Sequence, residues 1–229
     1  MKNLVILYTK FPRMGNTKTR IAQESNEQFA WIVGFYSLTD TINKVSHSSE
    51  YDLVVVVNSE VEARIFREKF GVNTYALNEK TLTLDQSGRF TYLFSLFIKK
   101  YQKVMLIPSD VPAITEKTLI DGFKALNSTP YTFGPEHNGG VYLIGMNKSP
   151  KKLFDNVRWS TSHSVKDLFK NAGKNAQLLE CKGDLNVLQD LFSLQDSIEK
   201  YSPLLYTALT KVGLYRPQQK LEEFSYAYY

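Results

Sequence analysis

Two runs of consecutive apolar residues constrain the fold of this chain more than any other feature: "LVVVV" within residues 52–57 and "VMLI" within 103–107. A strand with one face in water alternates apolar and polar side chains, so these runs indicate strands that are covered on both faces. Weaker or shorter runs rich in strand-forming residues lie at 4–8, 72–77, 130–134, 141–145 and 176–181. The sequence therefore predicts a sheet that is buried between two layers of helices.

Helical patterns separate most of these runs. Apolar residues recur near the 3.6-residue period at 26–45, 59–71, 88–101 and 115–126. Ser25, Ser59 and Thr115 are expected to cap three of these helices, and Gly71 is expected to end the second. Strands that alternate with helices predict a three-layer α/β/α fold with a mostly parallel sheet.

The composition is that of a globular chain in a reducing compartment. The 229 residues are 43% hydrophobic and 22% charged, enough for one full domain. The single cysteine, Cys181, excludes an intramolecular disulfide and favours a cytoplasmic location, and its apolar surroundings predict a core residue. No apolar run is long enough to predict a membrane span.

The last 29 residues differ from the rest of the chain. Residues 201–229 contain six of the fourteen tyrosines and end in "FSYAYY". The sequence therefore predicts a domain at residues 1–200, followed by an aromatic-rich tail or helical arm at 201–229. This segment could pack on the domain, cover a sheet edge or form a homodimer.

Positive charge is concentrated near the N-terminus. The net charge is +5, and residues 1–23 hold five basic residues and no acidic one. They are Lys2, Lys10, Arg13, Lys18 and Arg20. Such a local field suits a phosphate-bearing ligand. No further basic cluster with interleaved aromatic residues extends it, which argues against nucleic-acid binding.

The loop "TKFPRMGNTKTR", residues 9–20, directly follows the first predicted strand. Gly15 allows a close turn, and a helix beginning near Thr17 would add free backbone N–H groups to the basic side chains. Ligands of parallel α/β sheets bind beyond the carboxyl ends of the strands, where this loop lies. The loop fits neither common glycine-rich phosphate motif, so a solvated turn is the alternative.

Asp110 follows another predicted strand, in the segment "PSDVP". A carboxylate at this position can bind Mg²⁺ or Mn²⁺, which take one or two carboxylates together with substrate phosphate oxygens. The alternative is a turn residue or a helix cap. Asp184 precedes a helical pattern, and it could complete a metal site with Asp110 or cap that helix.

Two further segments could contact a ligand. Gly139 and Gly140 open a predicted strand, so that a ligand or another backbone segment can approach closely, and Asn138-Gly139 is also a strong hairpin signal. The segment 158–165 places Trp159 beside several hydroxyl side chains, of which Ser160 or Thr161 is expected to cap a helix. The three histidines lack metal-site spacing, and no nucleophile-elbow motif is present.

Taken in order, these segments resemble one family, the glycosyltransferase-like DUF2064 group, which is related to the molybdenum-cofactor and phospholactate guanylyltransferases. Its first motif, K-x-P-x-x-G-x-x-K-T-R-L, is matched by Lys10, Pro12, Gly15, Lys18, Thr19, Arg20 and Ile21. Later motifs are matched by Gly88-Arg89, Pro108 to Thr115, Gly134 to Gly145, Trp159-Ser160-Thr161 and Asp184 to Leu191.

The resemblance implies a GT-A-like fold, as in nucleotide-diphospho-sugar transferases, and a metal-dependent nucleotidyl or glycosyl transferase. Its substrates would be a nucleoside triphosphate or nucleotide-sugar and a small-molecule acceptor. Catalytic residues would be Asp110, Lys18 and Arg20, and the metal, Mg²⁺ or Mn²⁺, would be held by Asp110 and Asp184. Nucleotide-binding residues would be Lys10, Pro12, Gly15, Lys18, Thr19, Arg20, Gly88 and Arg89. Acceptor-binding residues would be Asn138, Gly139, Gly140, Trp159, Ser160 and Thr161.

The chain departs from the family pattern at two carboxylates. Asn138 replaces the aspartate before the two glycines, and Asn186 replaces the second aspartate of the D-x-D segment. An amide oxygen can still bind a metal, but it lacks the full negative charge. A non-catalytic nucleotide-binding protein derived from such an enzyme is therefore the alternative function.

Overall fold

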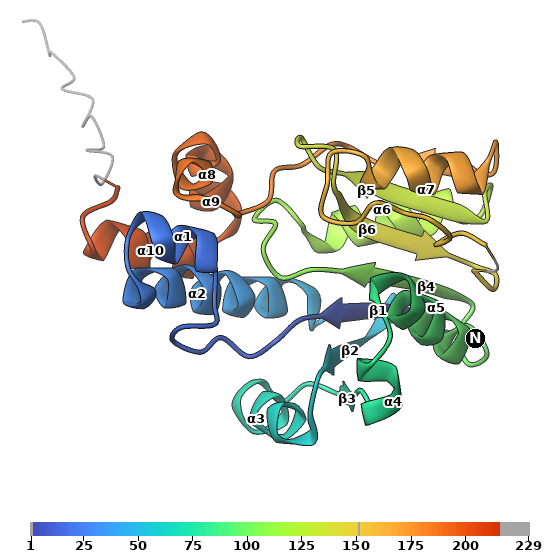
Figure 1. Cartoon of the computed structure of the whole chain (residues 1–229), viewed down its shortest axis with the longest axis horizontal. Coiled ribbons are helices and arrows are strands. Elements are labelled where there is room, and N and C mark those ends of the chain that lie inside the picture. The colour runs from blue at the N-terminus through green and yellow to red at the C-terminus, as the bar shows by residue number, and fades with distance from the viewer. Residues whose placement is uncertain (1, 151, 216–229) are drawn as a thin grey trace, which may run out of the picture.

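A seven-stranded sheet lies between layers of helices in the computed structural model, which describes residues 2–150 and 152–215 (Figure 1). Its strands are β1 (Asn3–Tyr8), β2 (Tyr51–Val57), β3 (Thr74–Ala76), β4 (Lys103–Ile107), β5 (Tyr131–Pro135), β6 (Val141–Met146) and β7 (Ala176–Leu178). The helices are α1 (Thr19–Glu24), α2 (Glu27–Val45), α3 (Glu60–Phe70), α4 (Glu79–Leu82), α5 (Gln86–Phe97), α6 (Glu116–Ala125), α7 (Ser164–Ala172), α8 (Leu188–Ser193), α9 (Gln195–Tyr201) and α10 (Pro203–Lys211). The predicted α/β fold is confirmed.

The sheet places the ends of β1 and β4 side by side. Its order is β3-β2-β1-β4-β6-β5-β7, and within the described residues only β6 runs against the others. The chain leaves β1 for β2 on one side and returns to β4 on the other. In doubly wound sheets, the crevice at such a switch point is where ligands bind.

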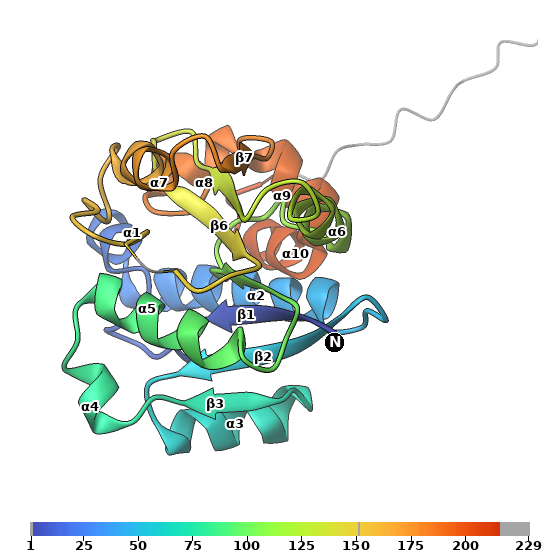
Figure 2. The same ribbon diagram turned by 90° about the vertical axis from the view of Figure 1, so that its right-hand side faces the viewer.

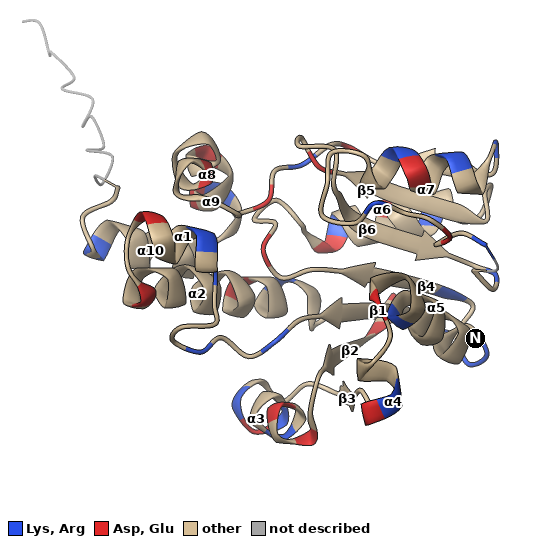
Figure 3. Cartoon of the chain, in the orientation of Figure 1, with Lys and Arg blue, Asp and Glu red and all other residues tan. Residues whose placement is uncertain are grey.

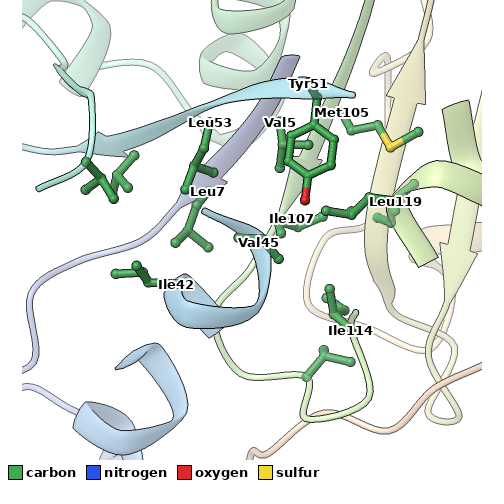
Figure 4. Packing of buried hydrophobic residues seen from close by; sticks show 14 of the residues in the cluster. Val5, Leu7, Ile42, Val45, Tyr51, Leu53, Met105, Ile107, Ile114 and Leu119 are labelled. Atoms are coloured by element: carbon green, nitrogen blue, oxygen red, sulfur yellow. The ribbon is translucent and has the colours of Figure 1, made fainter. Parts of the chain in front are cut away.

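The two consecutive apolar runs, in β2 and β4, contribute side chains to an apolar cluster on each face of the sheet, as predicted, and so does β1 between them. On one face, Val5 and Leu7 of β1 pack with Ile42 and Val45 of α2 (Figure 4). On the other face, Leu4 and Ile6 belong to a second cluster with residues of α5 and α7. Figure 2 shows α2 and α5 on opposite sides of β1. Because β1 and β4 are covered on both sides, their loops start from a rigid base.

A third apolar cluster joins the C-terminal helices to the N-terminal part of the chain. It contains Ile21, Ala30, Val33, Leu185, Leu191, Ile198, Leu205, Leu209 and Tyr215. The carboxylate of Asp40, on α2, accepts hydrogen bonds from the first backbone N–H groups of α10, at 3.2 Å from Leu204 and 2.9 Å from Leu205. Helix α10 therefore packs on the domain, while residues 216–229, with "FSYAYY", lie outside the described residues.

Helix boundaries were predicted less well than helix positions. Ser59, Gly71 and Thr115 do flank α3 and α6 as expected. The cap predicted at Ser25 is wrong, because Asn26 occupies the N-cap of α2 and its side chain accepts from the Phe29 N–H. Ser25 instead donates to the Ile21 carbonyl at 2.6 Å and ends α1, a short helix that precedes α2.

Within residues 2–150 and 152–215, no helix combines the length and the apolar character that crossing a membrane requires.

Lys44 ties helix α2 to the loop that follows β4. Its ammonium donates to the Pro112 carbonyl at 2.6 Å. Burial lowers the pKa of Lys44 from its usual 10.5 to about 8, an effect that Asp40 opposes and Lys182 adds to. Between these two values the unfolded chain binds more protons at this site than the folded chain, so the free energy of unfolding rises with pH.

We predict that Lys44→Met removes this pH dependence. Between pH 8 and pH 10, wild type should gain stability relative to the variant by at most about 1.4 kcal/mol per pH unit, the value of one proton. Urea unfolding at several pH values measures the difference. Lys174→Met, which removes an exposed lysine, is the matched control. A wild-type-minus-Lys44→Met difference that stays constant with pH would contradict the prediction.

Candidate functional site

The basic loop and the aspartate segment meet at one ion pair. The ammonium of Lys18 lies 2.7 Å from Oδ2 of Asp110, and it also donates to the carbonyl of Leu185. The two charged side chains are only 14% and 28% exposed. Figure 3 shows basic segments in the loop between β1 and α1, and acidic segments in the loops beyond the end of β4. The parallel register of β1 and β4 brings together residues that are 92 positions apart in the sequence.

The backbone of the basic loop is bent at two positions. Gly15 has φ 77°, and Lys18, at the N-cap of α1, has the left-handed values φ 47° and ψ 50°. The loop is fixed to helix α2, because the indole N–H of Trp31 donates to the Pro12 carbonyl at 3.2 Å. Helix α1 begins at Thr19, two residues later than expected, and is only six residues long. The positive charge of the loop therefore comes mainly from its basic side chains, rather than from free N–H groups at the start of a helix.

Asp110 is held by its backbone, while its carboxylate contacts Lys18. Its carbonyl accepts from the Leu185 N–H at 2.9 Å, and the neighbouring Ser109 hydroxyl lies 2.9 Å from that of Thr9, after β1. The alternative that Asp110 caps the next helix is wrong, since Thr115 and Thr118 form the capping box of α6.

Both interpretations of the glycine pair hold. Asn138 and Gly139 form the turn between β5 and β6, with Gly139 at φ 86°. A Cβ atom on Gly139 would lie 2.3 Å from the Ser162 carbonyl oxygen, so the turn also needs glycine for close approach to the segment before α7. The Gly139 carbonyl accepts from the Val165 N–H at 3.2 Å, which fixes the two segments together.

The segment with Trp159 lies beside this turn. The indole N–H of Trp159 donates to the Ser87 hydroxyl at 2.8 Å, which ties the segment to α5. The helix cap predicted at Ser160 or Thr161 is wrong, because His163 occupies the N-cap of α7 and Ser160 has φ 57°. The Thr161 hydroxyl is directed instead to the Arg158 carbonyl, at 2.7 Å.

Asp184 lies in the same site and is surrounded by amides. The Asn138 side chain donates to its Oδ1 at 3.0 Å, and the Asn186 side chain donates to its Oδ2. Burial and the charge of Asp110 raise the pKa of Asp184, while Asn186 and Lys18 act in the opposite direction. The capping role considered for Asp184 is wrong, since α8 begins only at Leu188.

Glu136 is a site residue that the sequence reasoning missed. It follows β5, and a Cβ atom on Gly140 would lie 1.9 Å from its carboxylate. Burial, followed by the charges of Asp184 and Asp110, raises the pKa of Glu136 to about 8, which the Asn138 side chain partly offsets. The available signal was an acidic residue at a strand end, two residues before Asn138.

Three cavities surround these residues. One of about 510 Å³ is lined by Arg20, Asp110, Glu136, Asn138, Gly140, Trp159, Ser160, Thr161, Asp184 and Asn186, among others. A second, of about 700 Å³, lies between the basic loop, α2 and the start of α3, and Lys10, Lys18 and Asp110 contribute to its wall. Asp110 therefore borders both, and it lies where two ligands could meet.

Gly88 and Arg89 are not brought to the basic loop. They lie in the first turns of α5, where the Arg89 guanidinium donates to the carbonyls of Leu84 and Leu82 at 2.9 and 2.7 Å. Arg89 contributes to a third cavity, of about 270 Å³, with aromatic side chains of Tyr8, Phe90, Tyr142 and Trp159. This cavity and the 510 Å³ cavity share Trp159 and three other residues.

The residues present fit a divalent cation that is held jointly with phosphate. No group of three or more Asp, Glu, His or Cys side chains forms a complete metal site among residues 2–150 and 152–215. Mg²⁺, however, usually keeps water and substrate phosphate oxygens and needs only one or two carboxylates. Asp110, Asp184 and Glu136 come from three different segments, and their mutual repulsion contributes to the raised pKa of the last two.

Cys181 is exposed, so its prediction as a core residue is wrong. Strand β7 ends at Leu178, before the cysteine, and beyond it only an isolated bridge of Lys182 with Glu136 continues the pairing. Its sulfur lies 3.2 Å from Nδ1 of His137, and burial together with the charge of Glu136 raises the pKa of the thiol. A raised pKa disfavours the thiolate, and the site contains no activated nucleophile at this position.

Comparison with known proteins identifies a family and a fold. The family model described as "Uncharacterized protein conserved in bacteria (DUF2064)" matches residues 41–161. A Desulfovibrio desulfuricans G20 protein, assigned as a nucleotide-diphospho-sugar transferase, superposes with a TM-score of 0.77 at 21% identity, covering 92% of this chain and 95% of the other. No curated protein matches the chain significantly by sequence.

Two more distant structures share the fold. The 4-diphosphocytidyl-2C-methyl-D-erythritol synthase of Anaerococcus prevotii has a TM-score of 0.57 at 11% identity, covering 86% of this chain and 96% of the other. The inositol-1-phosphate CTP transferase of T. maritima has a TM-score of 0.53 at 12% identity, covering 91% and 96%. At these identities the likeness establishes a shared GT-A-like fold and no more than the fold.

We predict that Asn138→Asp makes the site depend on a divalent cation. The change replaces an amide that donates to Asp184 with a further carboxylate, so repulsion should lower the melting temperature in EDTA by about 2–4 °C for each kcal/mol lost. Mg²⁺ or Mn²⁺ should restore it, with a larger upward shift than in wild type. Differential scanning fluorimetry measures both effects.

Asn43→Asp, an exposed substitution on α2, is the matched control and should show neither change. Equal responses of Asn138→Asp and wild type to both cations would argue against a metal site beside Asp184.

Proposed function

The chain belongs to the bacterial family described as DUF2064, and from this premise we propose that it is a nucleotidyl- or glycosyl-transferase. It binds a nucleoside triphosphate or a nucleotide-sugar beyond the carboxyl ends of β1 and β4. It transfers part of that substrate to a small-molecule acceptor. Two of the solved structures that share its fold are named a nucleotide-diphospho-sugar transferase and a CTP transferase, and these names support this class of reaction.

The contact between Lys18 and Asp110 carries the proposal. It joins the basic loop after β1, which contains no acidic residue, to the carboxylate after β4, at 2.7 Å, in the crevice where the strand order reverses. A polyphosphate needs cations around its oxygens, and a metal bound to that polyphosphate needs a carboxylate close by. The partly buried pair of Lys18 and Asp110 provides both the cation and the carboxylate.

The cavities suggest where the parts of the substrates bind. Phosphates would lie against Lys10, Lys18 and Arg20. The planar base would enter the 270 Å³ cavity, where Phe90 contacts Tyr8 and Trp159 edge to face. The acceptor would occupy the 510 Å³ cavity, over the turn Asn138–Gly140 and the segment Trp159–Thr161. Both substrates would then reach Asp110.

The residues of this chain would act mainly by positioning and by charge. Lys18 and Arg20 would stabilise negative charge on the phosphate leaving group while the acceptor attacks in line. A divalent cation held by Asp110 and Asp184 would supply further neutralisation of the phosphate oxygens. No covalent enzyme intermediate is required.

The second candidate function is nucleotide binding without catalysis. The observation that favours it is the pair of amides on Asp184, because Asn138 and Asn186 satisfy the carboxylate that a metal would otherwise use. A protein of this kind would bind a nucleotide through the basic loop without needing a divalent cation.

A thermal-shift panel separates the two candidates. Each nucleoside triphosphate and several nucleotide-sugars are added with and without Mg²⁺ or Mn²⁺. Stabilisation that needs both ligand and metal is the expected result for the transferase, and at 100 times Kd it amounts to about 2.7 kcal/mol. Stabilisation independent of metal favours the binding protein. No response to any nucleotide would contradict both functions.

We predict that Asp110→Asn removes the metal-dependent part of this stabilisation and leaves any metal-independent part. The substitution keeps the shape of the side chain but removes the charge that holds the cation. Asp121→Asn, on the exposed face of α6 where Asp121 pairs with Lys117, changes the same atoms far from the site and serves as the control. A metal-dependent shift that survives in Asp110→Asn would exclude Asp110 as a metal ligand.

A further inference from the structure

The carboxylate of Asp110 already has a cationic partner. The ammonium of Lys18 contacts Oδ2 of Asp110 and the carbonyl oxygen of Leu185. The Leu185 N–H donates to the Asp110 carbonyl at 2.9 Å. This backbone hydrogen bond keeps Oδ2 of Asp110 and the carbonyl oxygen of Leu185 near one another. A carboxylate oxygen beside a backbone carbonyl is a donor set that a hard divalent cation prefers. The ammonium therefore occupies a position suited to a metal.

The ion pair also lies where the two larger cavities adjoin. Asp110 lines both, while Lys18 lines the 700 Å³ cavity and Arg20 lines the 510 Å³ cavity. The backbone of Lys18 is left-handed, at φ 47°, a conformation that is uncommon for a residue with a Cβ atom. The bent backbone of the loop thus directs the ammonium toward Asp110, unlike the side chain of a lysine that extends freely from the surface.

We propose that Lys18 is a displaceable counter-ion of Asp110. Without ligand, its ammonium neutralises the carboxylate and closes the contact with Leu185. When a divalent cation and a polyphosphate bind together, the cation takes over Asp110 and the ammonium moves to the phosphate oxygens. The inference rests on the proposed function, and it adds that metal and polyphosphate bind cooperatively because each removes one partner of the ion pair.

Electrostatics gives the exchange its direction. An ammonium at Asp110 repels a divalent cation that approaches the same oxygen, so the metal alone binds weakly. A polyphosphate provides the ammonium with another anionic partner and the metal with further oxygen ligands. When the binding of two ligands is linked in this way, each ligand typically changes the affinity for the other by about 5- to 150-fold. The factor is the same for the metal and for the polyphosphate.

Mn²⁺ binding to the full-length protein tests the proposal without any assay of activity. Protein-bound Mn²⁺ is measured by equilibrium dialysis and electron paramagnetic resonance, for the metal alone and with inorganic tripolyphosphate, and protein-free samples give the Mn²⁺ that tripolyphosphate binds by itself. For wild type, tripolyphosphate should tighten Mn²⁺ binding by about tenfold or more. For Lys18→Met, Mn²⁺ alone should bind about tenfold more tightly than to wild type, and tripolyphosphate should add much less.

Lys10→Met is the matched control, because it removes the same charge from the same loop without touching Asp110. If Lys18→Met and Lys10→Met bind Mn²⁺ alone equally, the proposal is overturned. It is also overturned if Asp110→Asn binds Mn²⁺ as wild type does, or if wild type shows no coupling to tripolyphosphate. The wild-type coupling remains a test even if the Lys18 variant does not fold.

The two proposals fail separately. Suppose that nucleotides stabilise the protein only with metal, while Lys18→Met and Lys10→Met bind Mn²⁺ alone with equal affinity. In that case the transferase assignment stands and the counter-ion role is wrong. If Mn²⁺ and tripolyphosphate bind cooperatively through Lys18 while no nucleotide or nucleotide-sugar stabilises the protein, the proposed function is wrong instead.

Discussion

The parallel pairing of β1 with β4 is the constraint on which the rest of the structure depends. Asn3 aligns with Lys103 and Leu7 with Ile107, so both strands deliver their following loops to the same edge of the sheet. Burial on both faces fixes the two strands, and a shift of one residue would move each apolar side chain to the opposite face. The core therefore fixes where the two loops start, and the bent backbone of the basic loop then brings Lys18 to Asp110.

Features that depend on neighbouring residues could be predicted from the sequence. The runs at 52–57 and 103–107 indicate buried strands by themselves, and Ser59, Gly71 and Thr115 mark helix ends through local hydrogen bonds. Ser25 shows the limit of this reasoning. Asn26, one residue later, is an equally good cap, and only the presence of α1 decides between them.

Features that depend on distant contacts could not be predicted in this way. Glu136 gains its environment from Asp184, 48 residues later, and its position at a strand end does not reveal that contact. Arg89 belongs to the resembled motif, yet its donors reach the carbonyls of Leu84 and Leu82, and it faces the aromatic cavity. Motif order identified the segments, but the fold decides which of their side chains meet.

The C-terminal helices support the candidate site, because they pack against Leu185 in the third apolar cluster. Leu185, whose carbonyl accepts from Lys18, has a side chain that is buried in the same cluster as Ile21 of α1 and Leu205 of α10. The Glu24 carboxylate accepts from the Leu188 N–H at 2.8 Å and fixes α1 to α8. Packing of α8, α9 and α10 on α1 and α2 therefore sets the position of the carbonyl that holds the ammonium. A change in this cluster would reach Asp110 through one residue, which makes the charge balance of the site sensitive to how the C-terminal helices pack.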